Sequence, residues 1–160
     1  MRTTSMPTTS SPDNIFRAAQ IILIAGLICG TLDGLSALAL SGGKFVRLFQ
    51  FIASGLLGPE AFKGGMKVAA LGVALHFLIA LGASAVFYAA SRALPLLIDH
   101  AVLCGVLFGV AIHLFMNFAV IPMSAIGRRP FNPTGFGLQL LVHMIVVGPT
   151  IALTIRHYSR

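Results

Sequence analysis

Four ionisable side chains stand in the middle of long apolar stretches, where a charged group is costly to bury. They are Asp33, His76, His113 and His143. Ionisable residues inside membrane-spanning segments are rare, face the interior of a helix bundle and mark proton or solute pathways. Three imidazoles and a carboxylate also suit zinc, copper or iron. Alternatively, the same groups only hold helices together, through hydrogen bonds worth ~0.6 kcal/mol on average.

The composition indicates that these apolar stretches are membrane spans. Of 160 residues, 57% are hydrophobic and 9% are charged, against about 45–50% and about 25% in soluble domains. The net charge of +7 is spread thinly along the chain and forms no basic block, which argues against a nucleic-acid-binding protein. Cys29 and Cys104 show no CxxC or metal-type spacing, so they are interpreted as small apolar residues.

Four apolar segments are each long enough to cross a ~30 Å hydrocarbon core as a helix. The sequence predicts these spans at residues 18–41, 66–90, 100–122 and 134–155. A cleaved signal peptide is the alternative for the first, because residues 37–39 resemble a cleavage site, but the apolar stretch is too long for one. Residues 1–14 are predicted to form a disordered tail and residues 158–160 a short C-terminal tail.

Residues 44–57 carry a different pattern from the four spans. Polar side chains recur at three- and four-residue spacing, and apolar ones fill the other side: Lys44, Arg47, Gln50 and Ser54 against Phe45, Leu48, Phe49, Ile52 and Leu56. The pattern is typical of an amphipathic helix in the membrane interface, with a re-entrant segment as the alternative. The predicted fold class is therefore all-α, a polytopic membrane protein with four transmembrane helices in a bundle and one interfacial helix. We expect a kink at Gly148–Pro149.

Small residues recur at every fourth position in the spans, and polar residues lie on the same lines. The lines are Gly26, Gly30 and Gly34; Gly72, His76, Ala80 and Ser84; Ala101, Gly105, Gly109, His113 and Asn117; and Gly135, Gln139 and His143. Small residues at this spacing let helix backbones approach closely in lipid. Polar residues on these lines should therefore face the bundle interior, and Asp33 sits one position beside Gly34.

Depth in the membrane gives a second constraint on the polar residues. Measured along the helix axis, Asp33 and the three histidines lie about 12–15 Å from the same membrane face. Two amide side chains lie shallower, about 8 Å from that face. The sequence therefore predicts one intramembrane polar layer made of Asp33, His76, His113, Asn117, Gln139 and His143.

Several short motifs are distributed over the four predicted spans. They are Gly105-Val-Leu-Phe-Gly109 followed by His113, Asn117 and Pro122; Gln139-xxx-His143; Leu75-His76 with Tyr88; and the run from Gly26 to Gly30. Together they resemble the YagU-type family of small bacterial inner-membrane proteins, over most of the chain from about residue 20. The resemblance implies a multi-spanning inner-membrane protein with both termini in the cytoplasm and a link to acid resistance.

Three positions depart from the pattern of that family. His113 stands where a Gln is expected, Asn117 where a His is expected, and Gln139 where a Glu is expected. The layer stays polar while its members change, which disfavours a fixed set of metal ligands and favours a hydrogen-bonded interior. Loop charge adds no orientation of its own, because Arg2, Arg17, Arg92, Arg156 and Arg160 on one side nearly balance Lys44, Arg47, Lys63, Lys67, Arg128 and Arg129 on the other.

Three functions stay open at this point. The polar layer handles protons or a small polar solute, it only fixes helix packing, or it holds a metal or haem on His76, His113 or His143. The sequence holds no HxxxH pair and no nucleophile-plus-base motif, so neither a metal, a haem nor an enzyme activity is predicted. The expected partners are the lipid bilayer and further copies of the chain, with no nucleic acid, and no substrate is named by any motif.

Overall fold

The computed structural model describes residues 12–127 and 130–159, and nearly all of them are helical. The predicted disordered tail is wrong for residues 12–14, which open the first helix, whereas residues 1–11 lie outside the described part. Pro12 suits the first helical position because a helix leaves that N–H without a partner anyway, and Asp13 suits the positive end of the helix dipole. Arg128, Arg129 and Arg160 also lie outside the described residues.

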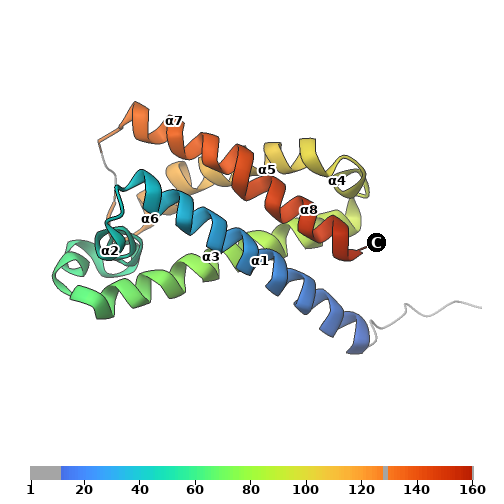
Figure 1. Cartoon of the computed structure of the whole chain (residues 1–160), viewed down its shortest axis with the longest axis horizontal. Coiled ribbons are helices and arrows are strands. Elements are labelled where there is room, and N and C mark those ends of the chain that lie inside the picture. The colour runs from blue at the N-terminus through green and yellow to red at the C-terminus, as the bar shows by residue number, and fades with distance from the viewer. Residues whose placement is uncertain (1–11, 128–129, 160) are drawn as a thin grey trace, which may run out of the picture.

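Within the described residues, four helical segments are long and apolar enough to cross a membrane, as predicted. They are α1 (Pro12–Leu40), α3 (Gly65–Ala93), α5 to α6 (Ala101–Phe115 and Ile121–Met123) and α7 to α8 (Pro133–Val142 and Gly148–Ser159). Figure 1 shows these segments running lengthwise in one bundle. Short elements connect them, namely a 3-10 turn at Gly58–Lys63 and α4 (Leu96–Asp99). The chain is thus an all-α protein built for a membrane.

A π-helical turn interrupts each of the last two spans. The first such turn, Met116–Val120, joins α5 to α6, and the second, His143–Val147, joins α7 to α8. Each turn ends two residues before a proline, Pro122 or Pro149. Proline has no N–H to donate, and its ring disturbs the hydrogen bonds of the preceding helical turn. The irregularity expected at Gly148–Pro149 is therefore accommodated in the turn just before it.

The segment predicted to be interfacial forms α2 (Phe45–Leu57), which runs across one end of the bundle and packs on α3 (Figure 1). The two backbones come close because Gly72 of α3 has no side chain, and a Cβ there would overlap the Phe49 carbonyl. One part of the amphipathic interpretation needs correction. Gln50 and Ser54, expected on a polar face, are buried against α3, where Gln50 Nε2 donates to the Gly65 carbonyl at 3.2 Å.

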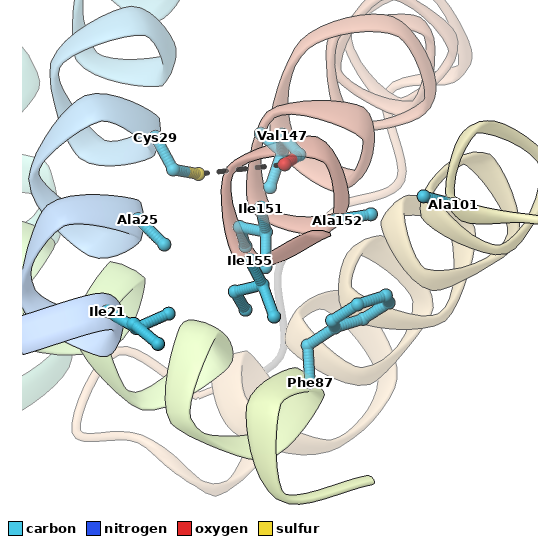
Figure 2. Close-up of a cluster of buried hydrophobic side chains, with 9 residues drawn as sticks. All are labelled: Ile21, Ala25, Cys29, Phe87, Ala101, Val147, Ile151, Ala152 and Ile155. Carbon is cyan, nitrogen blue, oxygen red and sulfur yellow. Dashed lines mark hydrogen bonds between the residues drawn. The ribbon is translucent and has the colours of Figure 1, made fainter. Parts of the chain in front are cut away.

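An apolar core joins α1, α3, α5 and α8 (Figure 2). Its members are Ile21, Ala25, Cys29, Phe87, Ala101, Val147, Ile151, Ala152 and Ile155. Lipid is as apolar as these side chains, so close packing rather than removal from water holds the helices together. In Figure 2, Ile21 lies level with Ile155 and Cys29 with Val147. This order fixes the antiparallel register of α1 against the last span.

Candidate functional site

The histidines of the third and fourth spans contact each other. The ring centroids of His113 and His143 lie 5.1 Å apart with the planes at 64°. His113 is only 2% exposed, and its ring also packs against the edge of Phe136 at 4.5 Å between centroids. The helix backbones meet one turn earlier, where a Cβ on Gly109 would overlap the His143 carbonyl. The glycine line of the third span thus brings the two imidazoles together.

Hydrogen bonds fix the orientation of this pair. His143 Nδ1 donates to the Gln139 carbonyl at 2.8 Å, which leaves Nε2 as the acceptor of a neutral ring. Asn117 Nδ2 donates to the His113 carbonyl at 2.9 Å and lies 3.4 Å from His113 Nε2. The two amide residues of the predicted layer therefore support the pair, Asn117 through its side chain and Gln139 through its backbone.

Both histidines of the pair stand at a π turn. His143 is the first residue of one turn, and His113 lies three residues before the other, which contains Asn117. Such turns are rare and occur frequently at functional sites, because the widened turn re-aims nearby side chains. Sequence reasoning did not identify the π turns. The available signal was a proline within three turns after each histidine, at Pro122 and Pro149.

Asp33 carries a buried carboxylate oxygen, Oδ1, that has no hydrogen-bond partner among the described residues. It follows Cys29 by one helical turn, and Cys29 Sγ lies 3.7 Å from the Val147 carbonyl oxygen (Figure 2). Because the two helices are antiparallel, one turn forward on α1 corresponds to one turn back from Val147, at His143. Asp33 therefore lies on the side of α1 that packs against the π turn, at the level of His143.

A buried carboxylate oxygen without a partner needs an explanation. Burying a polar atom without a hydrogen bond costs roughly 1–3 kcal/mol, and more for a charged group. Native proteins leave few such atoms, and each calls for an explanation, such as a catalytic role or a bound water or ion. The other three acidic residues of the sequence, Asp13, Glu60 and Asp99, lie at helix ends or in short connecting elements, whereas Asp33 lies within a span. These facts make Asp33, at the level of His143, and the histidine pair the strongest candidate site.

His76 occupies a different environment. Its Nε2 donates to the Gly30 carbonyl of α1 at 2.8 Å, and its ring packs edge-on against Phe49 and Phe77. A Cβ on Gly34 would lie 3.3 Å from His76 Nε2, so the glycine line of α1 makes room for this ring. The predicted single layer therefore divides in two. His76 belongs to the α1–α3 contact, whereas the site consists of Asp33, His113, Asn117, Gln139 and His143.

The described residues contain no group of three or more His, Cys, Asp and Glu side chains that could hold a metal ion. Structural zinc sites use four protein ligands, and catalytic sites use three with a water. His113 and His143 together supply two nitrogen donors, and Asp33 does not complete a set of three ligands with them, so the arrangement falls short of both kinds of zinc site. That the protein purifies without stoichiometric metal or haem stays a prediction.

An open groove of about 430 Å³ lies elsewhere, between the first turns of α1 and the end of α8. It is lined by Arg17, Gln20, Ile21, Leu23, Ile24 and Tyr158, and thus by no residue of the polar layer. In comparisons with known proteins, no family model, curated protein or solved structure matches this chain. Membership of the YagU-type family therefore stays an expectation from the sequence.

Proposed function

We propose that this protein is a multi-pass protein of the bacterial inner membrane that binds and passes protons through Asp33, His143 and His113. The observation that carries the proposal is the unpartnered, buried Asp33 oxygen at the level of a histidine pair set between two π turns. A proton needs only a line of titratable and hydrogen-bonding groups, whereas a solute needs a cavity around it. The groove at Arg17 and Tyr158 is lined by no residue of the pair.

Each residue has a distinct role in this proposal. Asp33 takes up and releases a proton at its unpartnered oxygen. His143 keeps Nδ1–H on the Gln139 carbonyl and presents Nε2 as the proton acceptor. The adjacent His113 ring receives the proton next, and Asn117 Nδ2, 3.4 Å from His113 Nε2, is a hydrogen-bond donor that orients this ring. Gly109 is a positioning residue, because its missing side chain allows the two rings to meet.

We also propose that both termini lie in the cytoplasm. The four apolar helices of the described residues support an even number of membrane crossings, with both ends of the described chain on the same side. The resemblance to the YagU-type family suggests that this side is the cytoplasm. Labelling of engineered cysteines in intact cells tests the orientation. A cysteine near Gly42 should react with a membrane-impermeant reagent, and one at Ser159 should not.

A second function is favoured by a specific hydrogen bond between helices. His76 of α3 donates a ring N–H to the Gly30 carbonyl of α1 at 2.8 Å. Bonds of this kind fix helix packing without any proton movement, as expected for a structural or accessory membrane protein. This hypothesis accounts for His76 completely. It leaves the buried Asp33 oxygen without a reason, so we rank it second.

Proton flux into liposomes carrying the purified protein separates the two functions. A trapped pH-sensitive dye reports the flux after a potassium diffusion potential is applied. We expect Asp33→Asn and His143→Gln each to lower protein-dependent flux by about tenfold or more, because each removes a group that must hold the proton. The matched control, His76→Gln, should keep the wild-type flux. No flux above empty liposomes, or full flux in a folded Asp33→Asn variant, would favour the packing function.

A further inference from the structure

The helix α2 turns an apolar face away from the bundle. Its buried residues are Phe49, Gln50, Ala53 and Ser54, and these pack toward α3. Opposite them, Leu48, Phe51 and Ile52 are partly exposed. At the two ends of the helix, Phe45 is 41% exposed, Leu56 63% and Leu57 45%. An exposed apolar face on a helix that crosses the end of a membrane bundle enters the boundary between headgroups and acyl chains. The outer face of α2 is therefore suited to lipid contact.

Cationic side chains border this face. Lys44 precedes α2, Arg47 lies in its first turn, Lys63 ends the 3-10 turn, and Lys67 lies in the first turn of α3; all four are exposed. Two contacts join the segments that carry them. Arg47 Cζ lies 4.7 Å from the ring centroid of Phe62, the neighbour of Lys63, and Gln50 binds the Gly65 carbonyl, two residues before Lys67. The cations therefore belong to one surface.

The charge of this surface is not cancelled by acidic residues. Glu60 pairs with Lys63 at 2.9 Å, but both side chains are largely exposed, at 74% and 77%. Among the described residues, Lys44, Arg47 and Lys67 take part in no ion pair. Counting the described residues alone, four cations and one carboxylate give the α2 end a charge of +3. Over the same residues, Asp13 and Asp99 at the opposite end offset two of Arg17, Arg92 and Arg156, which leaves +1.

We propose that the α2 end of the molecule binds the headgroups of anionic phospholipids through Lys44, Arg47, Lys63 and Lys67. Phosphate oxygens match the planar fork of arginine and the point charge of lysine. The acyl chains of the same lipid cover the apolar residues Phe45, Leu56 and Leu57. A phospholipid satisfies both halves of this surface, whereas free phosphate satisfies only the cations. Each cation near such a surface strengthens the attraction by about fivefold.

The test measures which lipids remain bound to the full-length protein. The protein is reconstituted with equal amounts of phosphatidylglycerol and phosphatidylcholine, extracted in mild detergent, and its bound lipid is quantified by mass spectrometry. We expect phosphatidylglycerol to exceed phosphatidylcholine by about a hundredfold, because the three cations outside the Lys63–Glu60 pair each contribute about fivefold. Equal retention of the two lipids by the wild type would overturn the proposal.

Charge variants locate the binding surface. The combined Lys44→Gln, Arg47→Gln and Lys67→Gln variant should lose the preference for phosphatidylglycerol. The matched control, Arg17→Gln, Arg92→Gln and Arg156→Gln, removes three cations from the other end and should keep it. An equal loss in both variants would overturn the assignment to the α2 end. If the triple variant fails to fold, Arg47→Gln alone should lower the preference about fivefold.

Competition identifies the source of the phosphate group. Excess inorganic phosphate should leave phosphatidylglycerol bound, because free phosphate offers nothing to the apolar face of α2. Displacement of the lipid by inorganic phosphate would show a phosphate-ion site instead and overturn the proposal. The result is independent of proton flux, since none of these residues belongs to the Asp33 site.

Discussion

Two helix contacts in this molecule arise from the same sequence signal and differ in structure. Both the α1–α3 contact and the contact of α5 with α7 and α8 combine a glycine line with histidine. Between α1 and α3, the two glycines nearest His76, Gly30 and Gly34, face side chains: a Cβ on Gly30 would meet the Phe77 ring at 2.8 Å. Between the last two spans, glycines face backbone, and a Cβ on Gly148 would overlap the Gly105 carbonyl.

The difference explains why one histidine is isolated and two are paired. In the α1–α3 contact, side chains lie between the two helix backbones around His76. His76 therefore contacts the Gly30 carbonyl and the rings of Phe49 and Phe77. In the contact of α5 with α7 and α8, the helix backbones touch. One π turn begins at His143, and the other begins three residues after His113. The imidazoles of His113 and His143 therefore meet. Backbone contact, rather than the presence of histidine, distinguishes the candidate site from a packing interaction.

The largest expected effect comes from filling the backbone contact. Gly109→Ala places a methyl group against the His143 carbonyl, and backbone on both sides cannot move out of the way. We expect a loss of about 3 kcal/mol in the free energy of unfolding, at the upper end for overpacking. Unfolding in mixed detergent micelles measures it. Gly137→Ala is the control, because nothing lies within 4 Å of its Cβ position. A Gly109→Ala variant as stable as this control would refute the backbone contact.

A smaller effect is expected from the same change in the other contact. In Gly30→Ala the new methyl group meets Phe77 Cδ1 and Cε1, which belong to a side chain that can rotate. We predict a loss of about 2 kcal/mol in the free energy of unfolding, in the middle of the range for overpacking. The same micelle unfolding experiment applies, with Gly82→Ala on α3 as the control because its Cβ position is open. A loss as large as that of Gly109→Ala would remove the distinction between the two contacts.

The smallest effect is expected at His76 itself. His76→Ala removes the 2.8 Å hydrogen bond to the Gly30 carbonyl and the ring contacts with Phe49 and Phe77. An interhelical hydrogen bond in lipid is worth ~0.6 kcal/mol on average, and we expect a loss of about 1 kcal/mol with the ring contacts included. Combining His76→Ala with Gly30→Ala should give less than the sum, since both changes act on one contact. If the two free-energy losses add exactly, the two substitutions act on separate interactions, which would contradict this prediction.

Sequence predicted the spans better than the site. Continuous apolar runs fix the number and approximate place of spanning helices, because only helices satisfy the backbone in lipid. The line of Gly105, Gly109 and His113 also predicted a close contact, which the structure confirms through the His143 backbone. Depth in the membrane could not show that His76 and His143 lie in different helix contacts. Depth fixes height along a helix, whereas the helix pairing decides which side chains meet.

Two further features could not be derived from the residue pattern. The burial of Gln50 and Ser54 depends on how α2 crosses α3, which periodicity does not specify, since any amphipathic helix has two candidate contact faces. The π turns depend on how the bundle absorbs Pro122 and Pro149, and a proline predicts an irregularity without predicting its type. The absence of a hydrogen-bond partner for Asp33 Oδ1 depends on the register of α1 against the last span and on how these helices pack.

The central claim is that Asp33 exchanges protons with the paired histidines and not with His76. Infrared difference spectra of the reconstituted protein between two pH values test it most directly. The chain has only four Asp and Glu residues, and the Asp33→Asn variant identifies the Asp33 carboxyl band. We predict that His143→Gln shifts this band and that His76→Gln leaves it in place. The account would be contradicted if the Asp33 band kept its position in the His143→Gln variant, or if it shifted equally in the His76→Gln variant.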